Sequence, residues 1–261
     1  NFSYVAVLGR KESEEKVKTL CEENKLDTYF LDYDEMLNSD IDTIYVALPN
    51  HLHSEFAKKA LLHGKHVIIE KPITANVAQL KELIEIAEKQ ENMLFEAMNI
   101  HYLPAYCSLK KELTQVGQLK IVSLNYSQYS SRYDAFKNGQ VLATFDPTKA
   151  GGALMDLNVY NIHTLVGLFG KPKKVYYEAN IERGIDTSGI LTLDYGDFKA
   201  SAIAAKDCNA PGRCTIQGTK GCFVIPKPVS QMEGYELLLN DSEVVEYKPS
   251  NMENRLYYEF M

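Results

Sequence analysis

The segment His66-Val67-Ile68-Ile69-Glu70-Lys71-Pro72 fixes the architecture of the first half of the chain, because it joins a strand to a charged pair and stops at a proline. Its three consecutive β-branched residues favour an extended backbone. Pro72 disfavours helical geometry at Lys71 and cannot donate to a sheet ladder, so the strand ends there. We therefore predict a buried strand with the Lys71 ammonium at its carboxyl end, the edge at which open α/β sheets bind ligands. Such a lysine can hold and polarise a hydroxyl or carbonyl oxygen; the alternative is a lysine that points into water.

Strand and helix patterns alternate on both sides of this segment. Further strands are predicted at residues 4–8, 43–48 and 93–97, with helices that follow Gly9 or begin near Asp34, Leu52 and Asn76. Right-handed crossovers join such units into a parallel, doubly wound sheet. Since the first strand, glycine-rich turn and first helix of such a domain are absent from the sequence, we expect this α/β domain to be incomplete at its amino end.

The rest of the chain is rich in strands. Strand patterns cover residues 119–130, 175–181, 190–195, 198–205, 214–217, 222–225 and 235–239, with helices at about 104–116 and 153–169 and a last one starting near Asn251. Hairpin-type turns such as Asp194-Tyr195-Gly196-Asp197 indicate a large, mostly antiparallel open sheet. We predict an α/β domain at residues 1–97 and an α+β domain at residues 98–261.

Composition and charge narrow the function. The chain has 261 residues, 45% of them hydrophobic, and a formal charge of -7. The charge argues against a nucleic-acid or anionic-membrane surface, and no apolar run reaches the roughly 20 residues of a membrane span. The five cysteines include no CxxC pair, which favours a reducing cytoplasm. His51 and His53 have no third ligand at useful spacing, so we expect no metal site.

A second polar group lies in the predicted helix at residues 153–169, just after Gly151-Gly152. Asp156, Tyr160 and His163 are spaced four and three apart, which puts them on one face of an α-helix. A tyrosine hydroxyl beside a lysine ammonium is a workable acid/base couple. The alternative is an interface tyrosine and an aspartate that only pairs with Lys71.

Together these motifs resemble the Gfo/Idh/MocA oxidoreductases. The resemblance rests on five motifs, which occur in order along the chain: Pro49-Asn50 with His53, Glu70-Lys71-Pro72, Phe95-Glu96-Ala97, Gly151-Gly152, and Asp156 with Tyr160. It implies an amino-terminal Rossmann domain that binds a nicotinamide dinucleotide, and a carboxyl-terminal open sheet that supplies the substrate wall and an oligomer contact.

The resemblance also implies roles for the polar residues. Lys71 matches the lysine that contacts substrate and nicotinamide, and Asp156 completes the catalytic group. Tyr160 stands where many relatives have histidine and where the dihydrodiol dehydrogenase and glucose-fructose oxidoreductase branches have tyrosine, so it is the expected proton donor or acceptor. His163 is a secondary pocket candidate, and Asn158 replaces a common glycine.

The end of the second Rossmann strand selects the cofactor. An acidic residue there would bind the ribose of NAD, but this sequence has Gly9-Arg10-Lys11 instead, which could neutralise a 2′-phosphate. This favours NADP, with NAD left possible and an exposed, unengaged Arg10 as the alternative. By the resemblance, the other cofactor-binding candidates are Leu48, Pro49, Asn50, His53, Glu70, Lys71 and Asn99.

Two functions follow from these observations. The first is an NAD(P)-dependent dehydrogenase that transfers a hydride between nicotinamide and a secondary alcohol of a sugar, polyol or cyclic diol. The second is a non-catalytic dinucleotide-binding regulator, which would need neither Lys71 nor Tyr160. Tyr129 and Arg132 are substrate-pocket candidates, although tyrosines of this region could equally cover an oligomer face. We expect a dimer, because an open sheet needs its exposed face covered.

Overall fold

The computed structural model describes residues 2–249 and 254–260, and it divides into two compact units. The first unit comprises residues up to Leu48 together with Leu52–Glu96. The second comprises Pro49–His51 and the chain from Ala97 onwards. Within the described residues, no helix is long and apolar enough to cross a membrane.

The first unit alternates strands and helices, as predicted. Its strands are β1 Ala6–Leu8, β2 Thr28–Phe30, β3 Thr43–Val46, β4 His66–Glu70 and β5 Leu94–Ala97. Its helices are α1 Glu14–Asn24, α2 Tyr33–Leu37, α3 His53–Leu62 and α4 Val77–Lys89. This order of elements, with its parallel pairing, confirms the α/β prediction.

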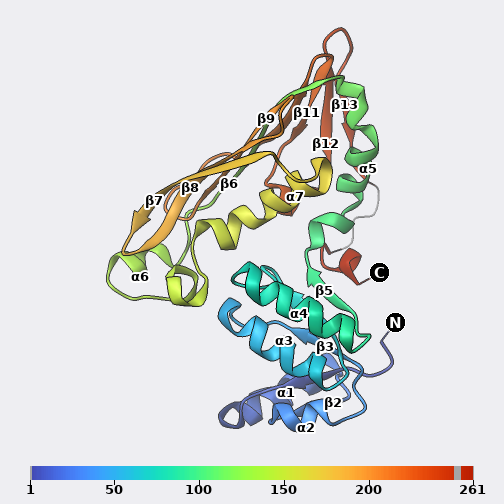
Figure 1. Ribbon diagram of the computed structural model, residues 1–261, viewed down its shortest axis with the longest axis vertical. Helices are drawn as coiled ribbons and strands as arrows, with labels where there is room; N and C mark the ends of the chain where they lie inside the picture. The colour runs from blue at the N-terminus through green and yellow to red at the C-terminus, as the bar shows by residue number, and fades with distance from the viewer. Residues whose placement is uncertain (1, 250–253, 261) are drawn as a thin grey trace. The chain divides into compact units, whose positions relative to one another are not determined.

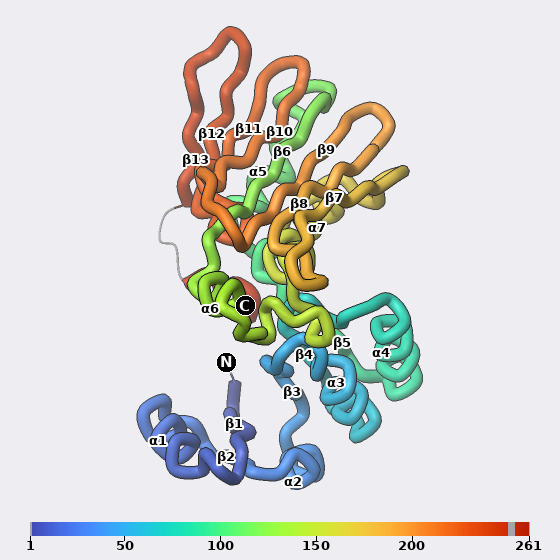
Figure 2. Tube along the Cα trace, turned by 90° about the vertical axis from the view of Figure 1, so that its left-hand side faces the viewer, coloured from blue at the N-terminus to red at the C-terminus, as the bar shows by residue number. Residues whose placement is uncertain are grey.

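The parallel strands of this unit form two ladders rather than one sheet. β1 pairs with β2, and β4 lies between β3 and β5; Figure 2 shows both groups.

Local sequence explains most of these boundaries. Val67 and Ile69 of β4 are fully buried against α3 and α4, whereas their neighbours are half-buried, so the strand alternates instead of being buried throughout. Asn76 caps α4 by accepting a hydrogen bond from the Gln79 N–H at 3.0 Å. The helix predicted to begin near Asp34 is α2, and Asp32 caps it, while Asp34 lies within its first turn.

The second unit contains an eight-stranded mixed sheet. Its strand order is β13-β12-β11-β10-β6-β9-β8-β7. Among the strand pairs that the structure describes in this sheet, β6–β9 is parallel and the others are antiparallel. The strands are β6 Leu119–Ser127, β7 Lys174–Glu182, β8 Ile185–Asp194, β9 Lys199–Ala205, β10 Cys214–Gly218, β11 Gly221–Ile225, β12 Tyr235–Leu239 and β13 Val245–Tyr247. The predicted α+β architecture is confirmed, with β13 as an additional short edge strand.

Helices cover one face of this sheet (Figure 1). Helices α5 Pro104–Glu112 and α7 Val159–Phe169 pack on the side where Val122 and Leu124 of β6 are fully buried. The short helix α6, Tyr133–Lys137, follows β6. On the opposite face, Ile121 is 51% exposed. The sheet is therefore open on one side, as expected.

The helix predicted at residues 153–169 is not uniform. Leu154–Asn158 form a π-helical turn, and the α-helix starts only at Val159. Side-chain amides account for the wider turn, since Asn158 donates to the Ala202 carbonyl at 3.0 Å and Asn161 to the Ile203 carbonyl at 3.1 Å. These bonds tie the helix to β9. Because residue 156 lies in the π-helical turn, the expected single α-helical face of residues 156, 160 and 163 is wrong.

Two other predicted helices also differ from expectation. The one at residues 104–116 is α-helical to Glu112 and continues as a 3-10 helix, Leu113–Val116. The start of the last predicted helix, near Asn251, lies outside the described residues, and beyond it the described chain forms a 3-10 turn at Tyr257–Glu259.

Candidate active site

The end of β4 presents the charged pair that the sequence singles out. The Tyr45 hydroxyl donates to Glu70 Oε1 at 2.6 Å, and Glu70 Oε2 accepts from the Lys71 N–H at 3.2 Å. The Lys71–Pro72 peptide bond is cis, and Lys71 is half-buried. Glu70 is thus oriented from both sides, next to the lysine that is predicted to act on substrate.

His53 links the ends of two strands of the first unit. Its Nε2 lies 2.7 Å from the Leu48 carbonyl oxygen and its Nδ1 lies 2.9 Å from that of Pro72. The side chain is fully buried. Because both ring nitrogens lie close to main-chain oxygens, His53 connects the chain after β3 to the chain after β4; its contact with a cofactor stays a prediction.

A tight turn places Arg10 beyond β1. The Gly9 N–H donates to the Phe30 carbonyl at 2.8 Å, and a Cβ atom at Gly9 would lie only 2.2 Å from Val17 Cγ2 of α1. Glycine is therefore required for this close approach. Arg10 follows it with an exposed side chain, so the end of this strand carries a cation.

In the second unit, a glycine turn leads into the π-helical segment. Gly152 has φ +104°, and a Cβ atom there would lie 1.9 Å from Asp186 Oδ1. Asp186 Oδ2 accepts from the Leu154 N–H and the Tyr177 hydroxyl, each at 2.7 Å. Burial, reinforced by the bond to Asp186, raises the pKa of Tyr177. Asp186 thereby fixes the first turn of the helix that carries Asp156.

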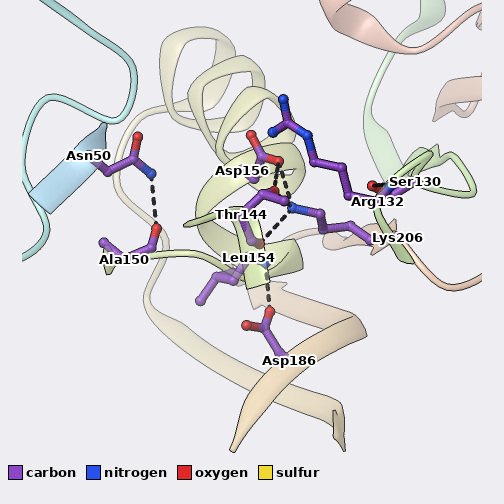
Figure 3. Close-up of polar contacts among 9 residues, drawn as sticks. All are labelled: Asn50, Ser130, Arg132, Thr144, Ala150, Leu154, Asp156, Asp186 and Lys206. Atoms are coloured by element: carbon purple, nitrogen blue, oxygen red, sulfur yellow. Dashed lines mark hydrogen bonds and ion pairs between the residues drawn. The ribbon is translucent and has the colours of Figure 1, made fainter. Parts of the chain in front are cut away.

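Asp156 is held by a lysine that the sequence reasoning missed. Lys206 Nζ lies 2.7 Å from Asp156 Oδ2 and 2.9 Å from the Thr144 carbonyl oxygen. The Thr144 hydroxyl donates to the same Asp156 oxygen at 3.0 Å. Figure 3 shows the three side chains converging. The available sequence signal was Lys206 itself, a lysine directly after a strand of buried small residues, as Lys71 follows β4.

A small polar cavity surrounds this group. It has a volume of about 230 Å³, and its lining is polar apart from one leucine: Gln128, Ser130, Ser131, Arg132, Thr144, Asp156, Leu157 and Lys206. Arg132, a predicted substrate contact, is part of the lining. A larger cavity of about 940 Å³ lies near β11 and β12, but no predicted site residue lines it. Of these two cavities, the smaller, polar one is therefore the one that predicted site residues line, namely Arg132 and Asp156.

The remaining helix candidates point to different neighbours. The Tyr160 ring lies 6.0 Å from that of Tyr126, measured between centroids. His163 Nδ1 lies 3.2 Å from His101 Nε2. Asp156, by contrast, reaches Lys206. Asp156 lies in the π-helical turn, whereas Tyr160 and His163 lie in α7, so the three do not share one regular α-helical face.

Three further candidates of the second unit have defined surroundings. Asn50 donates to the Ala150 carbonyl at 2.9 Å and so braces the turn before Gly151 (Figure 3). Asn99 is buried, and its Oδ1 has no hydrogen-bond partner within the described part of the chain. Tyr129 donates to Asp134 at 2.7 Å beside α6 and does not line the polar cavity.

Comparison with known proteins identifies the family. Residues 2–98 match the family described as "Oxidoreductase family, NAD-binding Rossmann fold", and residues 112–224 match the "GFO/IDH/MocA C-terminal domain". The scyllo-inositol 2-dehydrogenase (NADP(+)) IolU of Bacillus subtilis is 36% identical over 99% of this chain and 79% of its own length. The chain belongs to the Gfo/Idh/MocA oxidoreductase family.

Another relative and a solved structure are more distant in sequence. Trans-1,2-dihydrobenzene-1,2-diol dehydrogenase of Xenopus tropicalis is 29% identical over 81% of this chain, which spans 64% of that relative. The aldose-aldose oxidoreductase of Caulobacter crescentus shares the fold with a TM-score of 0.83, at 22% identity over 98% of this chain and 78% of its own. The predicted family and oxidoreductase class are thus confirmed, and these named relatives are enzymes rather than regulators.

Proposed function

We propose that this oxidoreductase uses NADP to oxidise a secondary alcohol of a polyol or sugar, and that it also catalyses the reverse reduction of the carbonyl group. The polar cavity around Asp156 is the observation that carries this proposal. Its lining offers amide, hydroxyl, ammonium and guanidinium donors together with a carboxylate acceptor. A substrate with several hydroxyl groups satisfies such a lining, whereas a cyclic diol, with only two hydroxyl groups, would leave most of these groups unpaired. The NADP-dependent inositol dehydrogenase among the relatives agrees with this choice.

The nicotinamide supplies the hydride chemistry when it is bound. The chain's own residues would handle the substrate oxygen and its proton. We assign the proton transfer to the Tyr160 hydroxyl and the polarisation of the oxygen to the Lys71 ammonium, because a phenol can exchange a proton and an ammonium can donate to the developing alkoxide. Asp156 would accept a hydrogen bond from a substrate hydroxyl and so orient the reacting carbon.

The strand ends fit a phosphorylated dinucleotide. Arg10 offers an exposed cation at the end of β1, where a ribose 2′-phosphate is read in Rossmann domains. Glu70, Lys71 and the Leu48–Asn50 segment stand at the ends of β4 and β3 and would hold the nicotinamide side. No glycine-rich turn for the pyrophosphate occurs among the described residues.

Titration calorimetry with NADPH and NADH tests the cofactor assignment on the natural full-length protein. Arg10→Ala should weaken NADPH binding about tenfold, the loss of one charge-assisted hydrogen bond, and leave NADH binding unchanged. Lys16→Ala, which removes an exposed charge of α1 outside the Gly9-Arg10-Lys11 stretch, is the matched control. An equal loss for both nucleotides would show that Arg10 does not read the 2′-phosphate.

We also propose that the protein is a cytoplasmic homodimer. All five cysteines are free, in keeping with a reducing compartment. The uncovered face of the eight-stranded sheet carries exposed apolar residues such as Ile121, Tyr176 and Ile190. A second copy would cover them.

A further inference from the structure

Lys206 is fixed by the sheet itself. It follows directly on β9, and its N–H donates to the Thr187 carbonyl of β8 at 2.8 Å. Its own carbonyl accepts from the Ser130 N–H, also at 2.8 Å. The residue is only 2% exposed. The main chain therefore holds Lys206 as firmly as a residue within the sheet.

The surroundings of the Lys206 ammonium match its chemistry. An ammonium has three donors, and three acceptors surround it: Asp156 Oδ2 and the carbonyl and hydroxyl oxygens of Thr144. The Phe145 ring lies 4.7 Å from Nζ and adds a cation–π contact. Burial of a charge is costly without such partners. The site is thus built around a charged lysine.

This arrangement determines the position of Asp156. Its Oδ2 receives hydrogen bonds from both Lys206 and Thr144, which fixes the rotation of the carboxylate. The Asp156 N–H donates to the Gly152 carbonyl at 3.1 Å, so the backbone is held as well. All three side chains line the polar cavity. The protein itself therefore fixes the orientation of the Asp156 carboxylate, which would in turn orient a substrate.

We propose that Lys206 is a positioning residue of the active site, which acts through Asp156. Its ammonium fixes the rotamer of Asp156 and supplies the counter-charge beside it. The carboxylate can then accept a hydroxyl of the bound polyol in one orientation, and this holds the reacting carbon in place. The inference rests on the proposed function, because it assigns Lys206 to the site that binds the polyol.

The test compares Lys206→Met with Lys199→Met in the natural full-length protein, using scyllo-inositol and NADP as substrates. Methionine keeps the length of the side chain and removes the charge. Lys199 is the matched control, since it also lies on β9 and pairs with Asp194 at 2.9 Å, but at the surface. We expect Lys206→Met to lower kcat/KM for the polyol about 100-fold, the effect of a misplaced group, with an unchanged Kd for NADPH. Lys199→Met should match the wild type.

Two further variants separate positioning from simple stabilisation. Lys206→Arg, which keeps the cation, should recover part of the lost kcat/KM. Asp156→Asn added to Lys206→Met should cause little further loss, because both changes remove the same oriented carboxylate. If Lys206→Met does not fold, Thr144→Val, which removes one donor to Asp156, should still lower kcat/KM about tenfold.

The outcomes separate a failure of the proposed enzyme function from a failure of the proposed role of Lys206. A wild-type protein that oxidises neither scyllo-inositol nor any other polyol tested would overturn the proposed function. A wild-type enzyme that is active, with a folded Lys206→Met variant of equal kcat/KM, would overturn the role of Lys206 alone. So would independent, multiplying losses in the double variant.

Discussion

Asp156 and Lys206 differ in how deeply they are buried, and this governs their effect on stability. The Lys206 side chain is 3% exposed and that of Asp156 is 35% exposed. Removing the carboxylate would leave a buried ammonium without its counter-charge, whereas removing the ammonium would leave a carboxylate that is partly exposed to water. The pair should therefore respond asymmetrically to substitution.

Urea denaturation measures this asymmetry. Asp156→Asn should lower the free energy of unfolding by about 3 kcal/mol, the cost of leaving a buried charge unpaired. Lys206→Met should cost clearly less, and the double variant should recover most of the loss. Equal and additive costs would contradict the burial argument.

Asp207, which follows Lys206 in the chain, is expected to make the stability of the folded protein depend on pH. Partial burial disfavours the charged form of Asp207, but hydrogen bonds outweigh it, chiefly those from the Ser188 and Thr187 hydroxyls at 2.8 Å, and lower the pKa of Asp207. A carboxylate with a lowered pKa in the folded state stabilises that state above its unfolded pKa, which is about 3.8. The stabilisation is lost as the pH falls through the folded pKa.

Asp207→Asn should therefore be less stable than the wild type at pH 7, with the difference in urea midpoint shrinking once the pH falls below about 4. Asp197→Asn, at an exposed position, is the control and should show no difference at either pH. A gap between Asp207→Asn and the wild type that widens in acid would refute the assigned direction.

The π-helical turn depends on the glycine that precedes it. Gly152 combines φ +104° with a contact to Asp186 that leaves no room for a Cβ atom. Gly184, in the two-residue turn between β7 and β8, has φ +78° and open space around it. Substitutions at the two glycines can therefore separate the cost of backbone strain from the cost of steric overlap.

Thermal unfolding of Gly152→Ala and Gly184→Ala tests this distinction. Gly184→Ala should cost about 1 kcal/mol, the price of a positive φ for an L-residue. Gly152→Ala should cost about 3 kcal/mol, because overlap with Asp186 is added. Equal losses would mean that Asp186 yields and does not fix the turn.

The sequence predicts the elements of this protein better than it predicts its site. The β-branched run and Pro72 were enough to locate β4 and Lys71, because both signals are local. The π-helical turn was not predictable in this way, since it depends on bonds from Asn158 and Asn161 to β9, far along the chain. Lys206 was missed for the same reason, because its contacts with Thr144 and Asp156 form only when the sheet has folded.

Assembly should depend on the open face of the eight-stranded sheet. Tyr176 lies on that face and is 64% exposed, while the adjacent Val175, 61% exposed, lies on the other. Light scattering should give a dimer mass for the wild type and for Val175→Asp, and a monomer mass for Tyr176→Asp, because a buried unpaired charge disrupts an interface. A monomeric wild type at micromolar concentration would exclude the proposed dimer.

The most direct test of the proposed enzyme is the rate at which it reduces NADP with scyllo-inositol, measured for the wild type and for Tyr160→Phe. The phenylalanine keeps the ring and removes the proton-transferring hydroxyl. We predict turnover by the wild type and a loss in kcat of about 100-fold or more in the variant, with NADPH binding unchanged. A wild type that binds NADPH but reduces no NADP with any polyol, or a Tyr160→Phe variant of equal rate, would contradict the account.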